Sequence, residues 1–299
     1  MRILTTGSSG MIGSALVNVL TNEGHEVYSL VRPGSNRQGI QWEPGRSVED
    51  HPHLNNLDAV VHLAGAGIAD RRWTKARKEV LWQSRVEATA HLRAELEQRP
   101  SPPKRFLSAS AIGWYGHRDH DILDESSTPG HGFLADLCAA WESAAQSNQM
   151  SVAHLRFGLV LDRSGGALAK MLPPFRLGLG GPLGDGRHWQ SWIGLSDAVR
   201  QLKYLCEAPL DQVKGVHNIV APEPVLQKDF ASALGRILRR PAFLPTPRWV
   251  IKMIFGDMGK EALLASTRVM PKRRLKSGPS FLTPKLEDAL IEALGRSSR

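Results

Sequence analysis

The stretch MRILTTGSSGMIG, residues 1–13, decides how the chain is expected to fold. Its apolar pair, Ile3 and Leu4, predicts a strand that begins at the second residue. Glycines follow at three-residue spacing: Gly7, Gly10 and Gly13. Apolar residues then recur at helical spacing until Gly24, which predicts a helix. A strand, a glycine turn and a helix in this order are typical of a dinucleotide-binding unit, where N–H groups at the helix start hold a pyrophosphate.

Length and composition favour an ordinary globular enzyme of 299 residues, with 41% hydrophobic and 22% charged residues. No apolar stretch reaches the roughly 20 residues that span a bilayer. The N-terminus is already a predicted core strand, which leaves no room for a signal peptide. We therefore expect a cytoplasmic protein with no membrane partner. The two cysteines, Cys138 and Cys206, match neither a disulfide framework nor a metal spacing, and we expect them to be reduced.

The net charge of +9 favours an anionic partner. The densest basic run, residues 268–276 (RVMPKRRLK), lacks interleaved aromatic residues and any nucleic-acid module, so we interpret it as a solvated face and expect no nucleic-acid partner. Asp50, His51 and His53 resemble a local ligand cluster, but their loop is rich in Pro and Asn. We interpret them as solvated and predict no metal site.

Strands and helices alternate through the N-terminal half. Strands are predicted at residues 26–31, 58–65, 106–109 and 152–157, and helices at 74–98 and 134–146. This alternation predicts an α/β fold, a doubly wound Rossmann-type parallel sheet. We expect this cofactor-binding domain to comprise residues 1–164 and 193–222.

The remaining residues, 165–192 and 223–299, are expected to form a smaller, mostly helical C-terminal lobe that holds substrate. The first of these segments is rich in Gly and Pro, which predicts a mobile substrate loop. His188, Trp189 and Trp192 could line a pocket there. Farther on, Ser196 and Asp197 predict the cap of a helix that runs to about residue 207.

Arg32 ends the second predicted strand, nineteen residues after Gly13. NAD-binding relatives of this motif place an acidic residue near that position, whereas the 2′-phosphate of NADP favours a cation. The sequence therefore predicts NADP (NADPH), the alternative being a surface loop that happens to be basic. The expected cofactor contacts are Gly7, Ser9, Gly10, Met11, Ile12, Gly13, Arg32, Leu63, Ala64, Gly65 and Arg85.

Several longer motifs resemble the extended short-chain dehydrogenase/reductase (SDR) family. They are the glycine turn, the strand end at 63–65 (LAG), residues 108–110 (SAS) with 114–116 (WYG), and Arg156 with the residues after it. Residues 71–89, 173–193 and 218–225 are similar to the atypical SDR group called "epimerase family protein". Residues 268–294 resemble the domain of unknown function that ends that group. The resemblance implies a Rossmann fold with NAD(P) chemistry.

The chain departs from the family's usual catalytic pair, a tyrosine followed four residues later by a lysine. Alignment on the trailing Glu142 puts Leu134 at the tyrosine position and Cys138 at the lysine position. Ser110 matches the family's substrate-orienting serine, and Tyr115 is a candidate proton donor, the alternative being a packing aromatic. Cys138 is interpreted as inert core.

Arg85 corresponds to an asparagine that faces the active site in many relatives, and a guanidinium there could hold a phosphate or carboxylate. A surface charge is the alternative.

Three functions stay open at this point. The first is an NADP(H)-dependent oxidoreductase, a monomer or homodimer, acting on a small polar or anionic molecule. The second is a nucleotide-sugar epimerase or dehydratase, and the third is a non-catalytic NADPH-binding regulatory protein. Consumption of NADPH, sugar conversion without net redox change, or binding without turnover would distinguish them.

Overall fold

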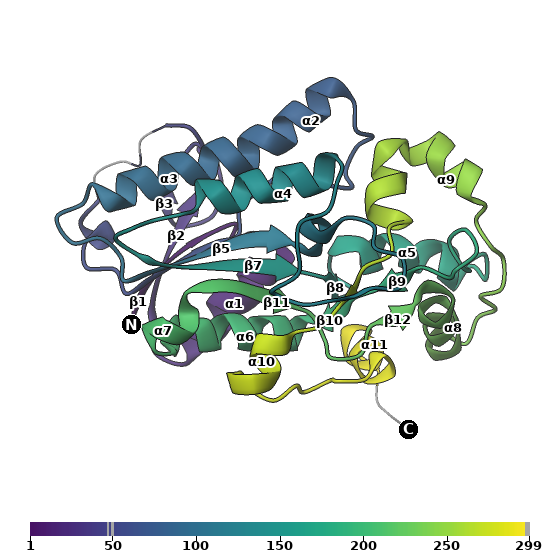
Figure 1. Cartoon of the computed structure of the whole chain (residues 1–299). Coiled ribbons are helices and arrows are strands. Elements are labelled where there is room, and N and C mark those ends of the chain that lie inside the picture. Colours follow the sequence, from purple (N-terminus) through teal and green to yellow (C-terminus); the bar gives the residue numbers. More distant parts are fainter. Residues whose placement is uncertain (47, 49–50, 297–299) are drawn as a thin grey trace.

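The computed structural model describes residues 1–46, 48 and 51–296 (Figure 1). Its centre is a seven-stranded parallel sheet in the order β11-β7-β5-β4-β1-β2-β3. The strands are β1 (Arg2–Thr6), β2 (Glu26–Val31), β3 (Ile40–Gln41), β4 (Ala59–His62), β5 (Arg105–Ala111), β7 (Ser151–Phe157) and β11 (Gly215–Ile219). From β1 the chain adds β2 and β3 on one side and then β4, β5, β7 and β11 on the other, as in a doubly wound sheet. The predicted fold class is therefore confirmed.

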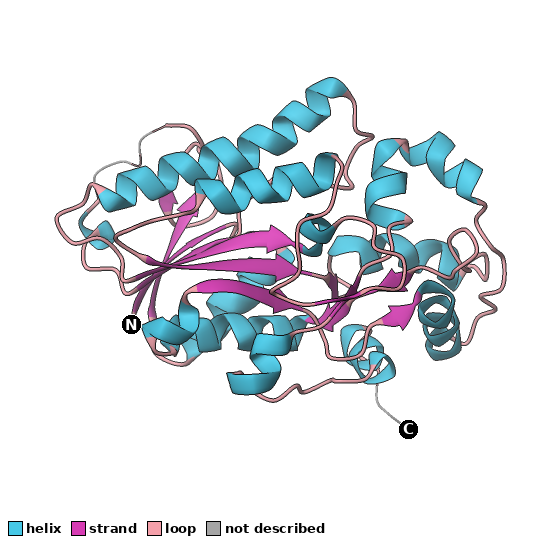
Figure 2. Ribbon diagram, in the orientation of Figure 1, coloured by secondary structure: helices cyan, strands magenta, loops and turns pink. Residues whose placement is uncertain are grey.

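Helices cover both faces of this sheet (Figure 2). One face carries α2 (Lys75–Trp82), α3 (Ala88–Glu97) and α4 (Phe133–Ala144), and the other carries α1 (Met11–Asn22), α6 (Leu195–Glu207) and α7 (Leu210–Val213). A π-helical turn, Gln83–Glu87, joins α2 to α3, so the helix predicted over 74–98 is nearly continuous.

The sheet is buried between these layers because its strands are apolar on both faces. All four residues of β4 are buried, and the side chains of Ile3, Leu107 and Leu155 form one core with Leu16 and Leu20 of α1. Each fully buried side chain of this size contributes about 1.5–3 kcal/mol.

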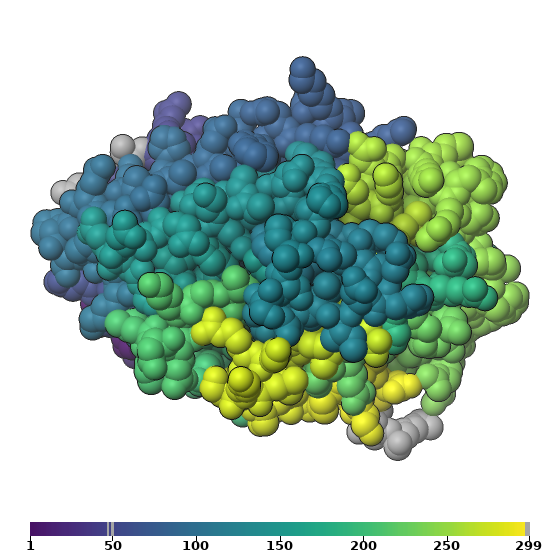
Figure 3. Space-filling view, in the orientation of Figure 1, coloured from purple at the N-terminus to yellow at the C-terminus, as the bar shows by residue number. Residues whose placement is uncertain are grey.

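A second core lies beyond the carboxyl ends of the strands. It is built on α5 (Gly166–Arg176), α8 (Gln227–Leu238) and α11 (Leu286–Ala293), around the fully buried Trp192. The other described strands and α-helices are β6 (Ile122–Leu123), β8 (Leu159–Leu161), β9 (Trp189–Gln190), β10 (Trp192–Gly194), β12 (Val225–Leu226), β13 (Arg268–Val269), α9 (Arg248–Phe255) and α10 (Lys272–Ser277). In Figure 3 the last part of the chain, yellow-green to yellow, covers the right-hand end and the lower edge of the visible face.

The expectation of a mobile loop over residues 165–192 is wrong for its first part, because this part forms α5 even though Pro173 and Pro174 lie inside the helix. Leu168, Leu172 and Phe175 share one buried face. Burial of this stripe outweighs the hydrogen bonds that the prolines remove.

Two further expectations need correction. Helix α6 begins at Leu195 with Gly194 as its N-cap, so Ser196 and Asp197 lie inside its first turn rather than capping it. The basic run 268–276 is not simply a solvated face. Arg274 is buried and pairs with the buried Asp197 carboxylate at 2.9 Å. The pair compensates two charges that would be costly to bury alone.

No helix among the described residues combines the length and apolar composition that crossing a bilayer requires.

Candidate functional site

The glycine turn between β1 and α1 brings the backbone close to its neighbours. Gly7 has φ +67°, and a Cβ there would lie 2.8 Å from the Leu63 carbonyl group. A Cβ on Gly13 would lie 2.3 Å from the Gly7 oxygen. Both positions therefore require glycine. Gly7 needs it for its positive φ and for the close approach to Leu63, and Gly13 needs it only for the close approach to Gly7.

The start of α1 offers free N–H groups for an anion. Its N-cap is Gly10, no described side chain caps the first turn, and no acidic residue lies in that turn. The N–H groups of Met11, Ile12 and Gly13 are thus left without the capping oxygen that most helices provide. Because the helix dipole also favours negative charge here, the turn fits a pyrophosphate.

Basic side chains lie beside this turn. Arg32 directly follows β2 and is exposed, and the Arg37 guanidinium donates to the Ser8 carbonyl at 3.3 Å. The strand end and the glycine turn are therefore neighbours, which is the arrangement that the predicted cofactor contact requires. Ser9 is exposed at the tip of the turn.

The end of β4 forms another wall of the same region. The hydroxyl of Thr6 accepts hydrogen bonds from the N–H groups of Leu63 (3.2 Å) and Ala64 (3.1 Å). Gly65 follows, and a Cβ on it would lie 3.3 Å from the guanidinium carbon of Arg85.

Arg85 is a buried cation in the π-helical turn before α3. Its guanidinium donates to the Ala66 carbonyl at 2.9 Å and lies 5.1 Å from the ring centroid of Trp141. Burial lowers its pKa, and no ion pair among the described residues involves it. The Ala66 carbonyl and the Trp141 ring offset part of the cost of burying this charge.

Ser110 belongs to a buried polar network at the end of β5. Its hydroxyl donates to Glu142 Oε1 at 2.7 Å, and the same carboxylate accepts from Arg156 at 2.7 and 2.8 Å. The Arg156 guanidinium lies 3.4 Å from the ring centroid of Trp114. Because the serine proton is directed to Glu142, its oxygen remains able to accept a hydrogen bond. Sequence reasoning used Glu142 only as an alignment mark and missed this role.

The phenol of Tyr115 lies inside the protein. It donates to Asn218 Oδ1 at 2.8 Å, lies 3.0 Å from the Asp124 carbonyl oxygen, and is fully buried. Burial raises its pKa. These contacts favour the packing role over proton donation.

Helix α4 carries Leu134 and Cys138, the two residues that sequence alignment sets against the family's catalytic pair. Leu134 is buried against Gly113, and Cys138 is buried with its pKa raised to about 12 by burial. A thiol with that pKa stays neutral, which agrees with its interpretation as core. At the start of α4, the Glu261 carboxylate accepts from the Leu134 N–H at 2.8 Å.

A cleft of about 990 Å³ opens at this end of α4. Its walls come from the segment after β5, the start of α4 and the region around α9. Its charged lining residues are Arg118, Arg248, Lys252, Lys260 and Glu261. Arg118 is occupied by carbonyl groups of residues 115, 128 and 129. The cations from the C-terminal lobe give the cleft an excess of positive charge.

Of the aromatic residues expected to line a pocket, His188 lines a small one of about 280 Å³ near Arg248. Trp192 does not, because it is fully buried and its indole donates to the Glu223 carbonyl at 2.9 Å. Trp189 packs under the Arg268 guanidinium, 4.2 Å from its ring centroid.

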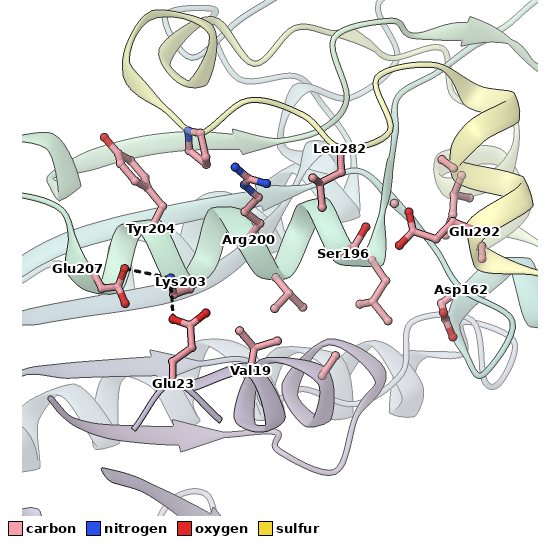
Figure 4. A pocket seen from close by; sticks show the side chains of 18 residues that line it. Val19, Glu23, Asp162, Ser196, Arg200, Lys203, Tyr204, Glu207, Leu282 and Glu292 are labelled. Carbon is pink, nitrogen blue, oxygen red and sulfur yellow. Dashed lines mark ion pairs between the residues drawn. The ribbon is translucent and has the colours of Figure 1, made fainter. Parts of the chain in front are cut away.

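Another pocket, of about 670 Å³, lies between α1, α6 and α11 (Figure 4). The lining contains none of the predicted cofactor or catalytic residues. At its edge Lys203 pairs with Glu23 at 2.7 Å and with Glu207 at 3.5 Å. Ligand atoms of Glu23, His25 and Glu207 lie within 4.8 Å of one another, but the lysine already compensates the carboxylates, and we assign no metal there.

The histidines considered as metal ligands lie at the surface, where His53 is exposed and His51 is half-buried. The His51 ring accepts from the His53 N–H at 3.3 Å, and the His53 ring stacks on Tyr28 at 4.5 Å. Asp50 lies outside the described residues.

Comparison with known proteins agrees with this architecture. The model of the NAD dependent epimerase/dehydratase family matches residues 3–220, and a domain of unknown function, DUF1731, matches residues 246–293. The "Epimerase family protein Mb2239" of Mycobacterium bovis is 38% identical over 299 residues, with 98% of each chain covered. Human "Epimerase family protein SDR39U1" is 37% identical over 298 residues, covering 98% of this chain and 99% of the human one.

Solved structures give the same result. The crystal structure of human SDR39U1 (isoform 2) with NADPH has a TM-score of 0.87 and 33% identity, and 99% of each chain is covered. A nucleoside-diphosphate sugar epimerase from Corynebacterium glutamicum has a TM-score of 0.76 and 32% identity, covering 98% of this chain and 58% of that one. The chain therefore belongs to the NAD-dependent epimerase/dehydratase family, in the group of epimerase family proteins that includes SDR39U1.

Proposed function

We propose that this protein is an NADP(H)-dependent oxidoreductase that works without the Tyr-Lys pair of its family. The observation that carries the proposal is the start of α1 at the glycine turn, which no described side chain caps. Arg85 is buried nearby and forms no ion pair with any of the residues that the structure describes. When bound, the dinucleotide would supply or accept a hydride. The chain's own residues would bind it through Gly7, Ser9, Gly10 and the N–H groups of residues 11–13.

Arg32 is the residue proposed to select NADP over NAD. It is exposed at the end of β2, and Arg37 from the same segment reaches the glycine turn. Two guanidinium groups here suit a 2′-phosphate, which a carboxylate would repel. The NADPH in the human relative's structure supports this choice.

The substrate is proposed to be a small anion bound in the cleft at the start of α4. Arg248, Lys252 and Lys260 line the cleft, with Glu261 as the opposing charge. Ser110 is buried and lies in β5, just before the segment that lines the cleft. We propose that it orients the substrate oxygen, because Glu142 fixes its hydroxyl at 2.7 Å. The proton would then come from water, since the Tyr115 hydroxyl donates its own proton to Asn218 Oδ1.

This function is tested by measuring NADPH consumption with small carbonyl compounds. The compounds carry a carboxylate, a phosphate or neither group. We expect turnover with the charged compounds alone. Ser110→Ala should abolish this turnover, and Lys252→Ala should raise the KM for the charged compounds. Leu275→Ser serves as the control, because Leu275 is exposed on α10. Turnover that is equal with neutral compounds, or unchanged in Ser110→Ala, would contradict the assignment.

A non-catalytic NADPH-binding protein is the second candidate. The commitment of both the Ser110 and Tyr115 hydroxyls to protein groups favours it. Tight NADPH binding without consumption across the same compounds would establish this function instead.

A further inference from the structure

Helix α9 exposes an apolar face instead of burying it. Of its described residues only Ile251 is buried, while Trp249 is 67% exposed, Met253 61% and Ile254 52%. Trp249 and Met253 are four residues apart and therefore lie on one stripe of the helix. Arg248 and Lys252, also four apart, form the neighbouring stripe, and both line the cleft.

Two loops carry exposed apolar side chains next to this helix. The exposed side chains, with their exposed fractions, are Leu177 (74%) and Leu179 (61%) in one loop and Phe243 (72%) and Leu244 (43%) in the other. The two loops are hydrogen-bonded, because the Gly184 N–H donates to the Thr246 carbonyl and the Thr246 N–H donates to the Pro182 carbonyl, both at 2.8 Å. The second loop leads directly into α9. We call these side chains the α9 surface: Leu177, Leu179, Phe243, Leu244, Trp249, Met253 and Ile254. Figure 1 places α9 at one corner of the molecule, away from the central sheet.

The charge around the α9 surface is positive. Residues 239–260 contain five cations and a single acid, Asp257. That acid pairs with Lys78 at 2.6 Å, which also lowers its pKa. Among nearby acids, Glu261 accepts from the Leu134 N–H and Asp185 from the Arg187 N–H. The cations are Arg239, Arg240, Arg248, Lys252 and Lys260.

This charge argues against a second copy of the chain as the occupant. A two-fold contact would set the same cations against each other, and the whole chain carries +9. An anionic partner gains instead from the same charges.

We propose that the α9 surface docks the protein peripherally on an anionic lipid bilayer. All side chains of the α9 surface except Leu244 are more than half exposed, which suits insertion among acyl chains. A helix with an aromatic and aliphatic face beside a basic face is typical of interfacial membrane binding, and nearby cations add attraction to anionic headgroups. The sequence pointed to no membrane partner because the surface is assembled from two distant segments and contains no spanning stretch.

Docking in this way would bring the cleft close to the headgroups, because Arg248 and Lys252 line it. The proposal does not depend on the cofactor or the reaction.

Co-sedimentation of the full chain with lipid vesicles tests the proposal. One set contains phosphatidylcholine alone, and the other an equal mixture of phosphatidylcholine and phosphatidylglycerol. We expect binding to the mixed vesicles that weakens with added salt. The double variant Trp249→Ser/Met253→Ser, and separately Phe243→Ser, should each lower the vesicle partition coefficient by about tenfold or more, since each removes inserted apolar area.

Leu275→Ser is the matched control because Leu275 is 56% exposed within the other basic segment, on α10. It should bind vesicles as the unmodified protein does. The variants' thermal unfolding midpoints should stay unchanged, since the altered side chains are exposed. No binding to mixed vesicles, equal binding by all variants, or a dimer that Trp249→Ser/Met253→Ser converts to monomer in sedimentation velocity would overturn the proposal.

Discussion

The hydroxyl of Tyr115 is held by two protein groups. Its proton is directed to Asn218 Oδ1, the Asp124 carbonyl oxygen lies on its other side, and the ring is fully buried under the Arg156 guanidinium, which lies 4.9 Å from its centroid. A group held so firmly stabilises the segment that follows β5.

Tyr115→Phe tests this interpretation. We expect the free energy of unfolding in urea to fall by about 1–3 kcal/mol, because Asn218 Oδ1 and the Asp124 carbonyl lose a buried donor. NADPH affinity and turnover should be retained. Turnover lost at full stability would instead establish Tyr115 as the proton donor.

Single residues were predictable from sequence where the backbone alone makes the demand. Gly7 and Gly13 are required by contacts within the turn itself. Glu142 was not predictable as the partner of Ser110, because the two lie 32 positions apart and meet only when α4 packs on β5. The burial of Arg85 likewise depends on the packing of Trp141 above it.

At the scale of elements, the strand, turn and helix at the N-terminus form a unit whose function follows from its geometry. Gly13 lies inside α1, with Gly7 close behind it, whereas Gly24 lies after the helix with no heavy atom within 4 Å of an added Cβ. Substitutions at Gly13 and Gly24 therefore distinguish the effect of a close contact on NADPH binding from the effect of backbone conformation.

Gly13→Ala should abolish NADPH binding in calorimetry and lower the unfolding free energy by about 2–3 kcal/mol, because the new methyl group meets the Gly7 carbonyl oxygen. Gly24→Ala is the control. Its φ of +82° costs about 1 kcal/mol in a residue with a Cβ, and NADPH binding should be unchanged. Equal loss of affinity in both variants would mean that the turn does not hold the cofactor.

Elements were predictable where periodicity and glycine agree, as in β1, α1 and β2. Helix α5 was missed because its prolines predict a loop, while the stripe of Leu168, Leu172 and Phe175 that stabilises it has meaning only against α8. The cap of α6 was misplaced for a similar reason, since Asp197 bonds Arg274 and the N–H groups of Leu282 and Thr283 instead of its own helix.

At the scale of the whole molecule, the side chains of α5, α8 and α11 form a core separate from the one around α1 and α6, and Leu161 and Ala221 belong to it. The division into a cofactor domain and a smaller lobe stays a prediction. The buried pair of Asp197 and Arg274 ties the C-terminal segment to α6. Several histidines are buried within this framework. Burial lowers the pKa of His62, His188 and His217 to about 4 each.

Buried neutral histidines predict that the fold loses stability in mild acid. Each folded-state pKa lies below the usual 6.5, so the unfolded chain binds more protons as the pH falls between these values. For His62 the loss approaches about 3 kcal/mol by pH 4. Unfolding free energies measured from pH 7 to pH 4 should fall less steeply in His62→Gln than in His91→Gln, where the histidine is exposed. Identical slopes would contradict the assignment.

Titration calorimetry measures whether the glycine turn and the basic end of β2 bind NADP(H). Cofactor-stripped protein is titrated with NADPH and with NADH, and the titrations are repeated with Arg32→Asp. We predict a clear preference for NADPH that Arg32→Asp abolishes or reverses, because the carboxylate repels the 2′-phosphate and accepts from a ribose hydroxyl. Binding of neither cofactor, or the same preference in both proteins, would contradict the account.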